Sequence, residues 1–198
     1  MVKRMMIKII LIFVGFFSVS NPQNHFMPNL PFGEYRLILD KVYPCESTRN
    51  HSIKINLYFS KKTSSTTELK GNFTFLIPLD DTLIFDTNLS SWGSTGGWIP
   101  NAYIMIVKKP CSTLKHTMGK AWLMLLKAFN MPSTCPIPVG AFTTSGLDVM
   151  DLIESHNYPK VFFYGKYKAV GKLKNIKNQV VGCLALEFTL LRPWEKPF

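Results

Sequence analysis

The segment Ile53–Ser60, IKINLYFS, decides the fold class of this chain. Apolar side chains occupy every second position from Ile53 to Phe59, and polar or amphipathic side chains occupy the positions between them. A period of two residues places these two sets on opposite faces of a β-strand. The segment therefore predicts a strand with one buried face, and the same pattern recurs along the chain.

Further strands are predicted on both sides of this segment. They span Glu34–Tyr43, Leu69–Ile77, Thr82–Phe85, Ala102–Lys108, Lys160–Leu173 and Val180–Leu191. The segment Asn88–Pro100 holds three glycines and two tryptophans, which predicts an adaptable surface loop. Seven to nine strands without alternating helices predict a mostly β fold, an antiparallel β-cup or sandwich.

One short helix is predicted between Cys111 and Cys135. Apolar residues recur at spacings of three, four and seven from Leu114 to Phe129, which is the period of an amphipathic helix. Pro132 ends the helical pattern because proline cannot continue a helix. We expect this helix to pack on a sheet.

The first twenty residues have the pattern of a secretory signal peptide. Lys3 and Arg4 precede the apolar run Ile7–Phe17, and small residues follow at Ser18 and Ser20. The apolar run is shorter than the ~20 residues that a transmembrane helix needs. The sequence thus predicts a signal peptide over residues 1–20, a single domain over residues 21–198 and a secreted, extracellular protein.

The net charge of +11 does not predict a nucleic-acid partner. Lysines and arginines come singly or in pairs, whereas a nucleic-acid-binding surface usually shows a clustered basic stripe. A positive charge spread over the chain favours two interpretations: it keeps the protein soluble, and it attracts the protein transiently to anionic membrane surfaces.

Three sequons also fit an extracellular protein. They begin at Asn50, Asn72 and Asn88, and each predicts a surface glycan in a secreted chain.

Four cysteines in an oxidising compartment predict two disulfides. Cys45, Cys111, Cys135 and Cys183 allow three connectivities. Local pairing favours Cys111–Cys135 around the helix, which leaves Cys45–Cys183, and the residues alone do not decide among the three. Because no C-x-x-C is present, we expect no metal site.

The sequence lacks the common signatures of catalysis. It contains no G-x-S-x-G elbow, no H-E-x-x-H and no calcium loop, and the neighbouring Asp80 and Asp81 fit a turn better than an acid–base pair. We therefore expect neither an enzyme nor a cofactor.

The apolar content suggests a different activity. The chain has 15 phenylalanines and 9 methionines, which could fill a solid core or line a pocket for an apolar ligand. Candidate lining residues are Trp92, Trp98, Met118, Trp122, Phe142, Phe162 and Tyr164.

The second half of the chain resembles a known family. The series Cys135-Pro-Ile-Pro-Val-Gly140, Phe142, Gly165-Lys-Tyr167 and Gly182-Cys183 is similar to the ganglioside-activator proteins and the insect CheB-like secreted proteins. The resemblance spans roughly Cys45–Leu191. It implies a β-cup with a lipid-binding interior, a first-to-last cysteine pair and a disulfide around the helical segment.

Three functions remain open at this point. The first is a secreted carrier of a lipid or apolar semiochemical, with the resemblance implying a role in chemosensation such as pheromone perception. The second is an activator that presents a lipid to a glycolipid hydrolase. The third is a solid-core extracellular module that recognises a partner such as a receptor.

Overall fold

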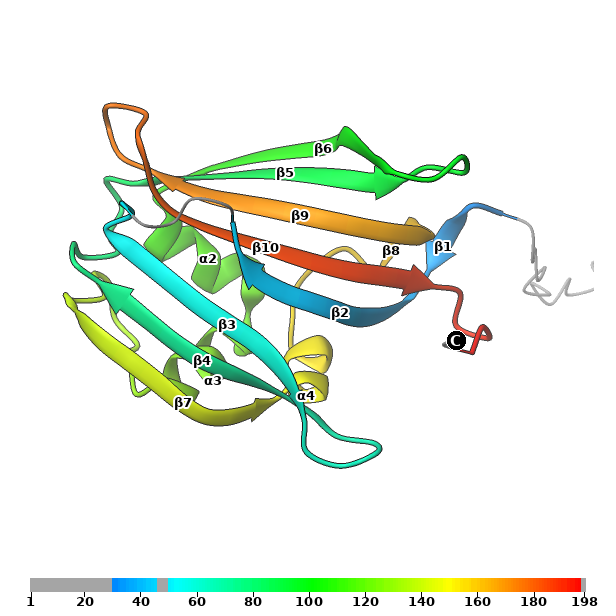
Figure 1. Ribbon diagram of the computed structural model, residues 1–198, viewed down its shortest axis with the longest axis horizontal. Coiled ribbons are helices and arrows are strands. Elements are labelled where there is room, and N and C mark those ends of the chain that lie inside the picture. The colour runs from blue at the N-terminus through cyan, green and yellow to red at the C-terminus, as the bar shows by residue number, and fades with distance from the viewer. Residues whose placement is uncertain (1–29, 46–49, 197–198) are drawn as a thin grey trace, which may run out of the picture. The chain divides into compact units, whose positions relative to one another are not determined.

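The computed structural model describes residues 30–45 and 50–196 (Figure 1). The chain divides into Met1–Leu30 and a compact unit, Pro31–Phe198, to which every helix and strand below belongs. The signal peptide predicted over residues 1–20 lies outside the described residues. Within the described ranges, no helix is long and apolar enough to cross a membrane.

Antiparallel strands dominate the compact unit, as predicted. The strands are β1 (Phe32–Glu34), β2 (Arg36–Pro44), β3 (Ile53–Lys61), β4 (Thr67–Phe75), β5 (Ile84–Trp92), β6 (Trp98–Lys108), β7 (Gly140–Asp148), β8 (Val161–Phe163), β9 (Gly165–Lys174) and β10 (Val180–Leu191). They form a five-stranded sheet in the order β2-β10-β9-β5-β6, a three-stranded sheet in the order β3-β4-β7, and the pair β1-β8.

The five-stranded sheet has two chemically distinct faces. In β5, Phe85 and Leu89 alternate with Asp86 and Asn88, and their partners in β9 follow the same alternation. We call the face of Phe85 and Leu89 the inner face and the face of Asp86 and Asn88 the outer face. The inner face is apolar, and the outer face carries a row of lysines on β9.

Three short helices cover part of the inner face and the three-stranded sheet. They are α2 (Pro110–Met118), α3 (Lys120–Ala128) and α4 (Val149–Glu154), and they lie on one side of the sheets in Figure 1. Trp122, Leu126 and Phe129 are buried with side chains of β3, β4 and β9 in one apolar cluster. The ring centroids of Phe129 and Phe73 are 4.8 Å apart. A solid core therefore fills this half of the unit.

The helical region differs from the prediction because Gly119 divides it. Gly119 has φ 59° and ψ −130°, and a Cβ atom there would contact the side chain of Asn157. The predicted single helix is therefore two helices, α2 and α3. Helix α4 was not predicted; Asp148 caps it by accepting a hydrogen bond from the Met150 amide at 2.9 Å.

The prediction of a loop over Asn88–Pro100 is wrong. Most of this segment belongs to β5 and β6, and only a short turn around Gly96 and Gly97, both with positive φ, joins the two strands. The rings of Trp92 and Trp98 close this hairpin with centroids 5.1 Å apart. Serine and tryptophan residues are accommodated in a β-strand when side chains on the neighbouring strand pack against them. Composition alone does not reveal which side chains those are.

Two disulfides connect distant elements. Cys45 at the end of β2 pairs with Cys183 in β10, and Cys111 in α2 pairs with Cys135 ahead of β7. This is the connectivity that local pairing favoured. Disulfides are typical of proteins that fold in an oxidising compartment.

Candidate apolar groove

An apolar groove lies on the inner face at the end of the five-stranded sheet that the solid core does not cover. It has a volume of about 380 Å³ and lies between β5, β6 and β9 on one side and the β1-β8 pair on the other. Its walls are formed by Phe32, Leu89, Ser91, Ala102, Tyr103, Phe162, Phe163 and Tyr167.

Aromatic contacts build the walls of the groove. Phe32 and Phe163 meet edge to face with centroids 5.0 Å apart, and Phe162 lies 5.8 Å from the ring of Tyr167. Tyr167 in turn stacks on Phe188 at 5.5 Å. Such pairs favour defined ring orientations, so the wall rings Phe32, Phe163, Phe162 and Tyr167 each pack against an aromatic neighbour.

One tyrosine hydrogen bond joins the β1-β8 pair to β9, and a second joins β1 to the residue that follows β8. The Tyr167 hydroxyl donates to the Phe163 carbonyl at 3.0 Å, and the Tyr164 hydroxyl donates to the Glu34 carbonyl at 2.9 Å. A Cβ atom at Gly33 would clash with the Tyr164 hydroxyl oxygen, so this close approach requires glycine.

The lining carries no ionisable group that would be charged at neutral pH. Its hydroxyls belong to Ser91, Tyr103 and Tyr167, and burial raises the pKa of Tyr167. A neutral aromatic groove favours an uncharged, apolar ligand segment because burying a charge there would cost several kcal/mol.

Two of the predicted lining residues lie at or beside the groove. Phe162 forms part of its wall. Tyr164 follows the lining residue Phe163 in the chain. Its ring faces the guanidinium of Arg192, whose Cζ is 4.7 Å from the ring centroid.

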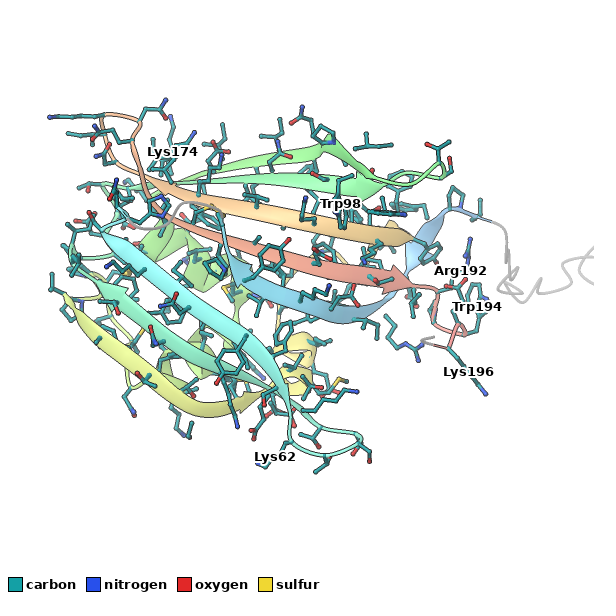
Figure 2. All side chains as sticks on the ribbon, in the orientation of Figure 1. Lys62, Trp98, Lys174, Arg192, Trp194 and Lys196 are labelled. Carbon is teal, nitrogen blue, oxygen red and sulfur yellow. A yellow bond between two sulfur atoms is a disulfide. The ribbon has the colours of Figure 1, made fainter. Side chains whose placement is uncertain are left out.

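Trp92 and Trp98 instead belong with the lysines of the outer face. The Lys168 ammonium lies 4.9 Å from the Trp98 ring centroid, and Lys166 lies within 6 Å of both rings. Figure 2 labels Trp98 among the side chains of the five-stranded sheet. This arrangement is a cation–π cluster. The two tryptophans do not line the groove.

Met118, Trp122 and Phe142 belong to the solid core. Trp122 is buried, and Met118 and Phe142 pack against the same cluster. The seven predicted residues thus occupy three separate environments, and the structure does not bring them together.

Sequence reasoning missed most of the groove. Leu89 and Ser91 fall in the segment predicted as a loop, and Phe32 ends the asparagine- and proline-rich segment that follows residue 20. Tyr167 belongs to the Gly-x-Tyr motif of the resemblance, which was the one signal that pointed to it. The remaining residues become neighbours only through the pairing of β1 with β8.

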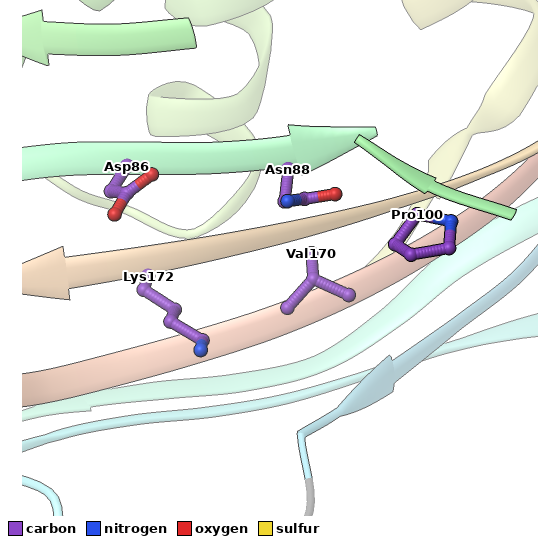
Figure 3. Close-up of a pocket in the computed structure, with 5 residues that line it drawn as sticks. All are labelled: Asp86, Asn88, Pro100, Val170 and Lys172. Atoms are coloured by element: carbon purple, nitrogen blue, oxygen red, sulfur yellow. The ribbon is translucent and has the colours of Figure 1, made fainter. Parts of the chain in front are cut away.

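A second hollow of about 300 Å³ lies on the outer face (Figure 3). Its lining mixes polar and apolar side chains: Asp86, Asn88 and Lys172 lie beside Pro100 and Val170. The Asn88 amide donates to Asn101 on β6. The charged side chains of Asp86 and Lys172 make this hollow a poor site for an apolar molecule.

The three sequon asparagines all reach the surface. Asn50 is exposed, and Asn72 and Asn88 are partly exposed. In the described part of the chain, no three histidine, cysteine, aspartate or glutamate side chains group in a way that could hold a metal ion.

No family model matches this sequence, and no curated protein matches it.

Proposed function

We propose that this protein is a secreted, non-enzymatic carrier that binds an apolar molecule, a lipid or an apolar semiochemical, in the groove between β1-β8 and the inner face. The observation that carries the proposal is a volume of about 380 Å³ lined by aromatic and aliphatic side chains without a charged group. Apolar burial contributes ~25 cal/mol per Å² of buried surface, so such walls retain a chain without hydrogen bonds.

The groove sets the chemistry of the ligand. One uncharged segment lies against Leu89, Phe162 and Tyr167, and any polar head group extends past the exposed ring of Phe163 into solvent. The resemblance to ganglioside-activator and CheB-like proteins supports the same class of ligand, and it extends the proposal to chemosensory transport.

Native mass spectrometry of protein secreted by insect cells, followed by organic extraction, tests the proposal. We expect a bound apolar molecule, and we expect the emptied protein to take up a fluorescent fatty acid. Protein that is ligand-free on isolation and takes up no probe would refute the carrier and favour an extracellular interaction module. Addition of a glycolipid hydrolase and its substrate separates a simple carrier from a lipid-presenting activator.

A further inference from the structure

Strand β6 leaves one edge of the five-stranded sheet unpaired. It is the last strand in the order β2-β10-β9-β5-β6, and among the described residues it pairs only with β5 (Figure 1). The N–H and C=O groups that point away from β5 are therefore available to another strand. At the end of β6 the Lys108 carbonyl already accepts a hydrogen bond from the Thr113 hydroxyl at 3.1 Å.

The residues of β6 make this edge unusually apolar. Between Trp98 and Lys108 the strand contains no charged residue. Ile104 and Ile106 are 53% and 63% exposed, and both lie on the outer face because they pair with Asn88 and Asp86. Tyr103, on the inner face, is also exposed. Natural edge strands usually carry charges, prolines or bulges that prevent pairing. In β6 the proline and the register shift lie at Pro100–Ala102, and Tyr103–Lys108 has only its terminal lysine.

The opposite edge of the β structure provides a contrast. Strand β7 is the edge of the three-stranded sheet, and its exposed positions include Thr143 and Ser145. It also ends at Asp148, and its register with β4 shifts between Leu69 and Gly71. The register of β6 with β5 also shifts, between Leu89 and Ser91, but Tyr103–Lys108 lies outside that shift and is regular.

We infer that two copies of this chain associate through antiparallel pairing of their β6 strands. The register of β6 with β5 shifts over Pro100–Ala102, where Asn101 has φ 62°, so the regularly paired segment is Tyr103–Lys108. Within it Tyr103–Val107 is centred on Met105, so a two-fold axis there pairs these five residues with themselves. An isologous contact of this kind closes at two copies and does not continue into a fibre.

The symmetric register matches the side chains of the strand. Met105 faces Met105 of the second copy, and each Ile104 faces an Ile106, which joins four isoleucines on the outer face. Each Lys108 lies just beyond the five paired residues, and the two lysines are separated by about 20 Å at ~3.3 Å per residue. The register therefore buries exposed apolar surface without bringing like charges together.

A glycan at Asn88 is compatible with this pairing. Asn88 lies on β5, one strand in from the edge, and belongs to the outer face. Its side chain stands perpendicular to the sheet, whereas the second β6 approaches in the plane of the sheet.

The size of the contact predicts a weak dimer. A strand contact centred on five residues on each side buries less than the ~1,600 Å² of a standard interface, so we expect a dissociation constant on the order of 1–100 µM. Sedimentation velocity from about 1 to 300 µM spans that range, and we expect the weight-average coefficient to rise from the monomer toward the dimer value. Glycosylated and enzymatically deglycosylated protein should behave alike.

Substitutions on the exposed isoleucines test the register. The double variant I104K/I106K brings four ammonium groups together and should weaken association at least tenfold. The variant I104E/I106K places a carboxylate opposite an ammonium at both contacts and should restore association. Ile176→Lys, at an 83% exposed isoleucine in the β9–β10 turn, is the matched control and should leave association unchanged.

Thermal unfolding of each variant shows whether it is folded, because these side chains lie outside the core. Wild-type protein that stays monomeric at about 300 µM, in either glycosylation state, would overturn the inference. Association that survives in folded I104K/I106K would also overturn it, since the contact would then lie elsewhere. Neither result depends on whether the groove binds a ligand.

Discussion

Filling the groove by substitution provides the sharpest test of the proposed ligand site. Ser91 lines the groove and pairs with Tyr167 of β9, so its side chain lies on the inner face beside the Tyr167 ring. Ser91→Phe adds a ring at this position without touching the solid core, and phenylalanine is favoured in strands. The new ring occupies space that the ligand would otherwise fill.

The groove volume sets the size of the effect. At ~30 Å³ per water-sized unit, about 380 Å³ holds a chain of roughly a dozen carbon atoms. A phenylalanine ring displaces about six of these units. Full burial is worth ~0.8 kcal/mol per methylene, and we take ~0.4 kcal/mol because the groove is open along one side. Ser91→Phe should therefore weaken binding by about 2.4 kcal/mol, roughly 60-fold.

The assay is a fluorescence titration with a twelve-carbon fatty acyl probe, carried out on delipidated wild-type and Ser91→Phe protein. Ser145→Phe is the matched control because Ser145 is an exposed strand serine on β7, away from the groove. Unchanged unfolding temperatures establish that both variants are folded. Binding by Ser91→Phe within twofold of wild type would refute the placement of the ligand in this groove.

Three further predictions concern stability. Replacing both Cys45 and Cys183 by alanine should lower the free energy of unfolding by about 5 kcal/mol in urea titrations. The reason is that this disulfide closes a loop with a sequence separation of 138 residues. A loss below ~1 kcal/mol would contradict the chain-entropy account. Phe129→Ala should cost ~3–5 kcal/mol, since Phe129 is fully buried, and a loss near zero in the same titration would mean that the core is not packed there. Burial lowers the pKa of His156, so just below the usual histidine pKa the unfolded chain binds more protons than the folded chain. The free energy of unfolding therefore falls as the pH decreases through that window. This pH dependence should be shallower in His156→Gln, and a profile identical to that of the wild type would contradict the assignment to His156.

Local patterns in the sequence determined the fold class. Alternation from Ile53 to Phe59 predicts β3 because burial of one face requires a period of two, and the structure confirms this strand. The two disulfides follow the pairing that separation along the chain favoured. The helical period between Cys111 and Cys135 also predicted helix correctly, although the break at Gly119 depends on the approach of Asn157 from another element.

Only the tertiary structure decided where the groove lies. Phe32 and Phe163 are 131 positions apart, and they become neighbours because β1 pairs with β8. The same holds for the division of the aromatic residues: Trp122 enters the solid core, Trp98 meets the outer-face lysines, and Phe162 faces the groove. Composition predicts that aromatic side chains seek burial, but which of them meet is decided by strand pairing between segments far apart in the chain, and no local pattern encodes that pairing.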